Sequence, residues 1–291
     1  MKRLIPSATS TRRSGFTLLE LLMVIAVIAI LVALLTAALQ GARVKARIAQ
    51  VGAEISQLDT AVTKFNSTYN IDPPSSLNIP KVGDNWAAID RSKVRAIWPQ
   101  FDFATNGGLG NSTAKSLSGA ECLVFFLGGL PLTSTTSTTM TGFSKNPILP
   151  WSAAGANREG PYFEFDSGRL VDLDGDSFPE FLDPLPGQTA PYQYYASQGK
   201  SYTIDAATNP VGFYVLTDAS KNPQRVYLKA EKTGAVGKNV PQRSESFQII
   251  SPGLDGLYGP GGIYTDGSEL TGTRASEADN ITNFSAGPLK P

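Results

Sequence analysis

The fold is decided by the stretch Arg12-Arg13-Ser14-Gly15-Phe16-Thr17-Leu18-Leu19-Glu20, a basic segment that ends in glycine and leads directly into an apolar run. From Phe16 to Leu39 the chain has one charged side chain, that of Glu20, and neither Gly nor Pro. A run of this length and composition can cross the hydrocarbon core of a bilayer as a helix. We therefore expect a single transmembrane helix over residues 16–41.

The charges around this helix predict its orientation. The basic residues of the N-terminal segment all precede the apolar run: Lys2, Arg3, Arg12 and Arg13. By the positive-inside rule, the N-terminus stays in the cytoplasm and the rest of the chain is exported. A secretory signal would place a small-residue cleavage site after the apolar run, whereas Gly41-Ala42-Arg43-Val44 leads straight into more helix. The helix is thus expected to remain part of the protein.

Apolar residues continue beyond the membrane segment at alternating spacings of four and three. They are Val44, Ile48, Val51, Ile55, Leu58, Val62, Phe65 and Tyr69. This spacing predicts one helical stripe, so the helix should run unbroken from about Thr17 to Tyr69, with residues 42–72 as its amphipathic half. Pro73 and Pro74 then end it. The stripe is expected to face the protein's own sheet, and a coiled coil with other chains is the alternative.

Residues 73–291 form a predicted β-rich exported head, because their composition shifts to Gly, Pro, Ser, Thr and Asn with short apolar runs. The strand candidates are residues 162–165, 192–195, 213–216, 226–228 and 247–250. Residues 120–127 are either a short buried helix or a strand, and Thr133 to Thr141 reads as a flexible loop tip. The expected fold class is α+β: a long N-terminal helix packed on a C-terminal antiparallel sheet, with loop insertions.

The composition argues against several classes of function. The sequence has no histidine, the commonest general base and zinc ligand, and its single cysteine, Cys122, lies in an apolar run where a buried, inert thiol is expected. We therefore expect no enzyme; a hydrolase using carboxylates such as Asp174 and Glu180 is the alternative. Basic and acidic residues are equal in number, and the exported part has no basic cluster with interleaved aromatics, so no nucleic-acid partner is expected.

The order of Gly15, Phe16 and Glu20 after a charged leader resembles the class III signal of type IV pilins and type II secretion pseudopilins. The resemblance implies that a prepilin peptidase removes residues 1–15 and that the new amine of Phe16 is methylated. It also implies the pilin fold, and a Glu20 paired with the N-terminal amine of a neighbouring subunit. Such a pair would offset the cost of a carboxylate in hydrocarbon; the alternative is a Glu20 solvated by lipid headgroups.

The same resemblance implies the partners and the location. The chain would polymerise with itself and with other pseudopilins, contact membrane lipid, and be assembled by an inner-membrane platform. It would cross the bacterial inner membrane once, with its head in the periplasm. It looks most like a major G-type pseudopilin but is longer than such subunits. A type IV pilin or minor tip subunit, with an adhesive or substrate-binding head, is therefore the alternative.

A second resemblance to G-type pseudopilins lies in the C-terminal part. Its motifs are Asp183-Pro184, Pro191-Tyr192, the run from Phe247 to Gly256, and Asp279-Asn280-Ile281. The resemblance implies calcium bound by Asp255 and Asp279, with Asn280 where the family often has a second Asp. The carboxylates available to complete this site are Asp266, Glu269 and Glu277. Calcium can fasten a Gly-rich loop that has no disulfide, and a turn held by Asp-Gly geometry alone is the alternative.

A third acidic segment runs from Asp172 to Asp183. Read as a calcium loop, it places Asp172, Asp174 and Asp176 at positions 1, 3 and 5, and Asp183 at position 12. The loop departs from the usual pattern at position 6, where serine replaces glycine. The alternative is a solvated Asp-rich turn between strands.

Overall fold

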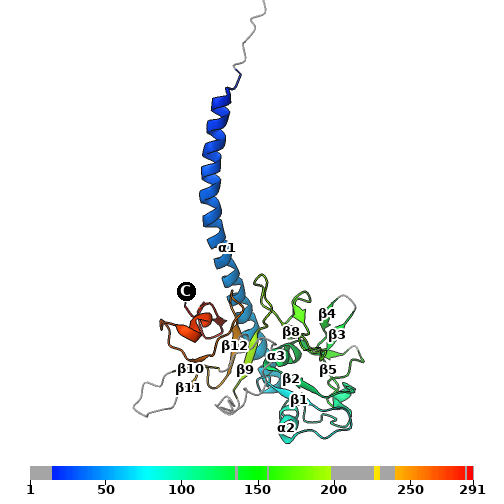
Figure 1. Cartoon of the computed structure of the whole chain (residues 1–291). Coiled ribbons are helices and arrows are strands. Elements are labelled where there is room, and N and C mark those ends of the chain that lie inside the picture. The colour runs from blue at the N-terminus through cyan, green and yellow to red at the C-terminus, as the bar shows by residue number, and fades with distance from the viewer. Residues whose placement is uncertain are drawn as a thin grey trace, which may run out of the picture. The chain divides into compact units, whose positions relative to one another are not determined.

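The computed structural model describes residues 15–134, 137–155, 157–197, 226–229, 240–285 and 287–290. The chain forms two compact units, Met1–Ala46 and Arg47–Pro291. The first helix, α1 (Leu18–Tyr69), agrees with the predicted span within one residue (Figure 1). It ends where Asn70 takes a left-handed conformation (φ 58°) and donates its N–H to the carbonyl of Asn66, before the two prolines.

The apolar stripe of α1 is buried from its second member onward. Within the second unit, Ile48 and Tyr69 are half-buried, and the residues between them are fully buried: Val51, Ile55, Leu58, Val62 and Phe65. The prediction is wrong for Val44, which is exposed in the first unit. The buried residues join one apolar core with side chains of the head. The stripe therefore faces the chain's own head, as expected, and is not free for a coiled coil.

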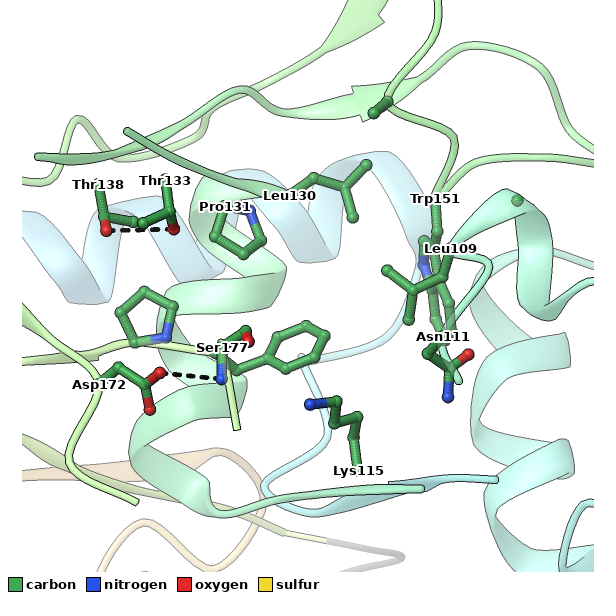
Figure 2. A pocket seen from close by; sticks show the side chains of 14 residues that line it. Leu109, Asn111, Lys115, Leu130, Pro131, Thr133, Thr138, Trp151, Asp172 and Ser177 are labelled. Atoms are coloured by element: carbon green, nitrogen blue, oxygen red, sulfur yellow. Dashed lines mark hydrogen bonds between the residues drawn. The ribbon is translucent and has the colours of Figure 1, made fainter. Parts of the chain in front are cut away.

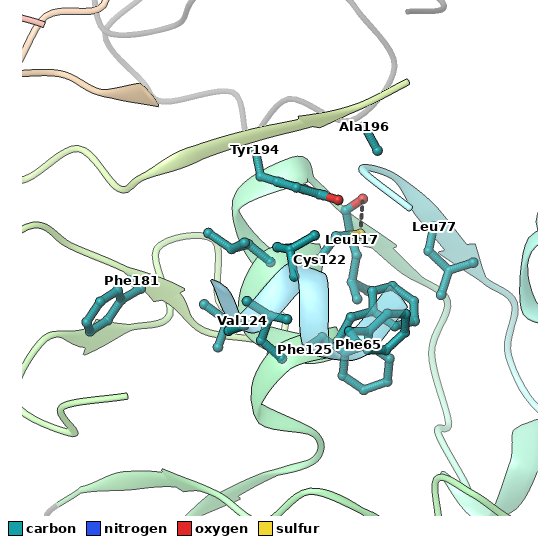
Figure 3. Packing of buried hydrophobic residues seen from close by; sticks show 14 of the residues in the cluster. Phe65, Leu77, Leu117, Cys122, Val124, Phe125, Phe181, Tyr194 and Ala196 are labelled. Carbon is teal, nitrogen blue, oxygen red and sulfur yellow. Dashed lines mark hydrogen bonds between the residues drawn. The ribbon is translucent and has the colours of Figure 1, made fainter. Parts of the chain in front are cut away.

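The segment that could be a helix or a strand is a helix, α3 (Gly119–Gly128), in which every residue is buried. Its start is fixed by a capping box: Ser118 accepts the N–H of Glu121, and Glu121 accepts the N–H of Ser118. Figure 3 shows Cys122 and Val124 of α3 among core side chains that come from distant parts of the chain. The ring of Phe65 in α1 lies 5.9 Å from that of Phe126 in α3.

Two predicted strands pair in a three-stranded antiparallel sheet. Its order is β14 (Ile281–Thr282), β12 (Phe247–Ser251) and β9 (Gln193–Ala196). In this register Phe247 faces Ala196 and Ile249 faces Tyr194, and β9 and β12 lie side by side in Figure 1. Every residue of these three strands is buried, so this sheet lies within the core of the head.

A second small sheet contains the predicted strand near residue 227. β10 (Tyr227–Lys229) pairs antiparallel with β11 (Val240–Pro241) and parallel with β13 (Gly262–Ile263). The expected single antiparallel sheet is therefore wrong for the described residues, which form several sheets of two or three strands. The candidate strand at 213–216 lies outside the described residues. Residues 162–165 form no strand.

The remaining elements of the described residues lie between α1 and β9 in the sequence, except for one near the C-terminus. The helices are α2 (Ala88–Ile97) and two 3₁₀ turns, η1 (Asn106–Gly108) and, near the C-terminus, η3 (Gly272–Glu277). The two-stranded pairs are β1 (Leu77–Ile79) with β2 (Lys115–Leu117), β3 (Pro131–Thr133) with β4 (Thr138–Met140), β5 (Phe143–Ser144) with β6 (Arg158–Glu159), and β7 (Leu170–Val171) with β8 (Glu180–Phe181). The prediction of a flexible loop at 133–141 is wrong for Thr133 and for Thr138–Met140, which pair as parts of β3 and β4.

A charged group on α1 fastens this helix to the head. Glu54 accepts hydrogen bonds from both terminal nitrogens of Arg169, one of them at 2.9 Å, and from the hydroxyl of Tyr192 at 2.7 Å. The side chains of Glu54 and Arg169 are only 12% and 22% exposed. The guanidinium of Arg169 also stacks on the ring of Phe181, 4.3 Å from its centre. This bidentate pair couples the membrane-proximal helix to the sheet region of the head.

Glu54→Ala should lower the free energy of unfolding of the head by about 2–4 kcal/mol, because it removes the carboxylate that accepts hydrogen bonds from the largely buried Arg169 and Tyr192. Urea unfolding of the full chain in detergent micelles measures this. Glu159 is the matched control, since its pair with Lys145 is exposed on both sides and Glu159→Ala should cost less than about 1 kcal/mol. Equal effects of the two substitutions would contradict this account of the anchor.

Candidate functional site

The described residues of the first unit leave an apolar surface of this unit exposed. Helix α1 contains one segment long and apolar enough to span a bilayer, Leu18–Leu35, with a mean hydropathy of 3.1 and no residue buried within the chain. A contiguous apolar surface of this size is unfavourable in water. Such surfaces mark sites of contact with a membrane or with another protein. This segment therefore fits a membrane anchor.

The start of α1 is built around Glu20. One oxygen of its carboxylate accepts both the backbone N–H and the hydroxyl of Thr17, each at 2.8 Å, and the N–H of Glu20 donates to the Thr17 hydroxyl at 3.2 Å. This reciprocal pattern is a capping box, with Thr17 as N-cap and Glu20 three residues later. Glu20 thus has a local partner within its own chain, a role that the sequence analysis did not foresee.

The predicted cleavage point lies just before this cap. Phe16 is 76% exposed, and a β-carbon added to Gly15 would meet nothing within 4 Å. Access to the bond between Gly15 and Phe16 is therefore not restricted by the described part of the chain. The rest of the predicted leader, residues 1–14, lies outside the described residues.

The two carboxylates of the C-terminal motif meet at one turn: Asp255 belongs to this turn, and Asp279 accepts hydrogen bonds from its backbone. One oxygen of Asp279 accepts the backbone N–H groups of Leu254 (2.5 Å) and Asp255 (3.0 Å), while Asp255 accepts the N–H of Leu257. Burial, with a smaller contribution from the charge of Asp279, raises the pKa of Asp255. Gly253 adopts φ +68°, and a β-carbon there would lie 2.4 Å from the carbonyl oxygen of Asp279. The turn thus requires glycine, and calcium binding by Asp255 and Asp279 stays a prediction.

The Asp-rich segment between β7 and β8 is a tight loop ordered by its own carboxylates. Asp172 accepts the backbone N–H groups of Gly175, Asp176 and Ser177 at 2.8–3.1 Å, and so uses both of its oxygens. Asp174 accepts the N–H of Asp176, and one oxygen of Asp176 accepts the N–H of Phe178. The backbone is therefore folded as a compact acidic turn, with free oxygens left on Asp174 and Asp176.

Asp183, the predicted twelfth-position ligand, is engaged elsewhere. It is buried, and its carboxylate accepts hydrogen bonds from the N–H of Leu185, the amide of Gln188 and the hydroxyl of Ser251. Among the described residues, the only group of three or more potential metal ligands close enough to share one ion does not include Asp183 or Asp172. Asp183 thus joins the loop to β12, where Ser251 lies, and its role as a calcium ligand stays a prediction.

Two buried glutamates lie beside this loop. Glu121, from the first turn of α3, was missed by the sequence analysis, and Glu180 of β8 was considered only as an acid or base. Burial is the main cause that raises the pKa of Glu121 to about 8 and that of Glu180 to about 9. The signal for Glu121 was its place in Ser118-Gly119-Ala120-Glu121, a capping-box sequence before an apolar run.

A pocket of about 480 Å³ opens next to the same loop. Figure 2 shows Asp172 and Ser177 on one side of it and Leu109, Asn111 and Trp151 on the other. Lys115 also lines this pocket. Most of the lining comes from residues 108–153, which lie outside the sequence motifs that resemble those of pseudopilins. An apolar wall with a few polar groups is typical of small-ligand sites.

Comparison with known proteins identifies one segment of the chain. Residues 10–36 match the prokaryotic N-terminal methylation motif, which is the prepilin signal of type IV pilins and pseudopilins. The match covers Gly15, Phe16 and Glu20 and most of the apolar segment of α1. No curated protein and no solved structure matches the chain. The prepilin signal is thus established, and the role of the head rests on its own residues.

Proposed function

We propose that this chain is a structural subunit of a periplasmic type II secretion pseudopilus, anchored and assembled through α1. The observation that carries the proposal is the prepilin signal at residues 10–36, followed at once by an apolar span that the chain leaves uncovered. A filament of such subunits would bury that surface against neighbouring helices after the subunit leaves the bilayer. The G-type resemblance of the C-terminal motifs supports a pseudopilin.

The proposal includes the route to assembly. A prepilin peptidase would cleave after Gly15 and methylate Phe16, and an inner-membrane platform would add the subunit to a polymer of itself and other pseudopilins. The N-terminus would lie in the cytoplasm and the head in the periplasm of a bacterium. Until assembly, the span would contact membrane lipid, and the local cap from Thr17 would satisfy part of the Glu20 carboxylate.

We propose a structural and not an enzymatic role for the head. The chain has no histidine, and Cys122 is buried in α3, where burial raises its pKa well above the ordinary value. A thiol held neutral in this way is a poor nucleophile. The absence of a basic cluster with interleaved aromatics in the exported sequence supports a function without nucleic acid.

A second candidate is a type IV pilin or minor tip subunit whose head binds a ligand. The pocket between Trp151 and Asp172 supports it, because residues outside the pilin-like motifs form most of its wall. The two candidates differ in what loss of the chain does to the cell. Deletion of the gene should abolish secretion of folded enzymes from the periplasm if the chain is a pseudopilin. Loss of surface fibres or adhesion with secretion unchanged would instead favour the second candidate.

A further inference from the structure

Among the described residues of the head, three carboxylate oxygens are buried without a hydrogen-bond partner. They are Oε1 of Glu121, Oε1 of Glu180 and Oδ2 of Asp176. Glu121 and Glu180 are 1% and 0% exposed. Buried polar atoms in folded proteins almost always have a partner, and an unpaired carboxylate oxygen is more costly than a neutral one. The position of these oxygens therefore calls for a group that the protein itself does not supply.

Two of the residues that carry these oxygens, Glu121 and Asp176, belong to one acidic cluster. Glu121, Asp174 and Asp176 each offer a carboxylate oxygen within 4.8 Å of the others. A calcium ion with oxygen ligands at 2.3–2.6 Å spans about this distance between opposite ligands. Glu180 lies beside the same loop, since its Oε2 accepts the backbone N–H of Leu173 at 3.1 Å.

We propose that Glu121, Asp174 and Asp176 bind one calcium ion in the head, with Glu180 as a further ligand or as an acceptor for a water bound to the ion. The donors are all hard oxygens, and two of the three principal ligands come from a short Asp-rich loop, the arrangement that calcium prefers. Lys115 is the nearby cation, and its ammonium donates to the main-chain carbonyl of Asp176. One ammonium does not balance this number of carboxylates.

The burial of the cluster supports this assignment. Glu121 is buried and Asp176 is half-buried, and each has a carboxylate oxygen without a hydrogen-bond partner among the described residues. A buried carboxylate is costly unless a cation or a hydrogen bond compensates its charge. A divalent ion bound by these oxygens would supply that compensation.

The capping box of α3 uses one oxygen of the Glu121 carboxylate and leaves the other available to an ion. Oε2 of Glu121 accepts the N–H of Ser118 in the capping box, which directs the second oxygen, Oε1, away from the helix backbone. The main chain of α3 is held in the core along its whole length, so this ligand is fixed. An ion here would link the buried helix α3 to the loop between β7 and β8, two segments about fifty residues apart in the sequence.

Titration of calcium chloride into the full chain, held in detergent and freed of metal with chelator, tests the proposal by calorimetry. The unmodified chain should show a saturable binding event. Glu121→Gln should weaken that event at least tenfold, and Gln at this position still accepts the Ser118 N–H, so α3 keeps its cap. Asp174→Asn should weaken it similarly; Asp174 is exposed, and the Asn oxygen can still accept the N–H of Asp176.

Glu159→Gln is the matched control, since it removes an exposed carboxylate that pairs with Lys145 and lies outside this cluster. It should leave the event intact. The proposal is overturned if the unmodified chain binds no calcium, or if both Glu121→Gln and Asp174→Asn bind as tightly as it does. Binding that is lost only in a further variant, Asp255→Asn, would assign the ion to the separate C-terminal turn. None of these outcomes depends on filament assembly, so they are separate from the test of the proposed function.

Discussion

Replacing Glu20 with alanine should abolish or strongly impair filament assembly while leaving membrane insertion intact. Insertion should not suffer, because the span becomes more apolar. Assembly should fail because the N-terminal amine of the neighbouring subunit is then left unpaired in hydrocarbon, at a cost of a few kcal/mol per subunit contact. Each 1.4 kcal/mol lowers an association constant tenfold, so the expected loss is large. Chemical crosslinking of membranes, read as a ladder of polymers, measures it.

Glu20→Gln separates the two roles that this residue can have. Glutamine at the third helical position still completes a capping box with Thr17, yet it carries no charge. If Glu20 pairs with a neighbour's amine, Glu20→Gln should assemble as poorly as Glu20→Ala. Normal ladders from Glu20→Gln together with loss in Glu20→Ala would mean that only the helix cap matters. Normal ladders from both would make Glu20 an ordinary interfacial carboxylate.

Gly15→Val should reduce processing of the leader by about tenfold or more, so that the uncleaved precursor accumulates and no subunit enters a filament. The reason lies in the peptidase, because the chain leaves open space around Gly15. A site shaped for a residue without a side chain excludes a branched one by sterics. Immunoblots that resolve precursor from mature chain give the measurement. Gly15→Ala is the milder control, and Gly15→Val processed at the normal rate would contradict the assignment of the cleavage site.

The long helix could be predicted from the sequence because its signals are local. The 3–4 spacing from Ile48 to Tyr69 specifies one buried face, and the prolines after Asp72 specify the end. Strands β9 and β12 were likewise visible as short aromatic and β-branched runs. The prediction failed for Tyr162 because this aromatic packs on Phe65 of α1, 5.6 Å between ring centres, without pairing as a strand.

Other features depended on contacts between distant segments. The Thr-rich run at 133–141 was read as a loop from its composition, yet threonine is β-branched and here pairs as a hairpin with Pro131–Thr133. Asp183 fitted the twelfth position of a calcium loop by spacing. The pairing of β7 with β8 instead carries it to Ser251, whose hydroxyl donates to its carboxylate. Sequence spacing gives the order of the candidate ligands along a loop. It does not show that Asp183 lies next to Ser251 of β12 in the folded chain.

The candidate calcium site shows the same limit. Asp174 and Asp176 stood out in the sequence, but the ligand that completes the cluster, Glu121, belongs to a helix more than fifty residues earlier. Its capping-box position predicts the start of a helix and says nothing about the loop beside it. Only the packing of α3 against β8 brings these carboxylates together.

Mass spectrometry of the intact chain, extracted from the membranes of cells that express it natively, tests the central claim most directly. The account predicts a protein that begins with Phe16, lacking residues 1–15 and heavier by one methyl group on its N-terminal amine. This result would establish that the prepilin signal is used and that the subunit is prepared for assembly through α1. A native chain that retains Met1, or one cut after the apolar run, would contradict it.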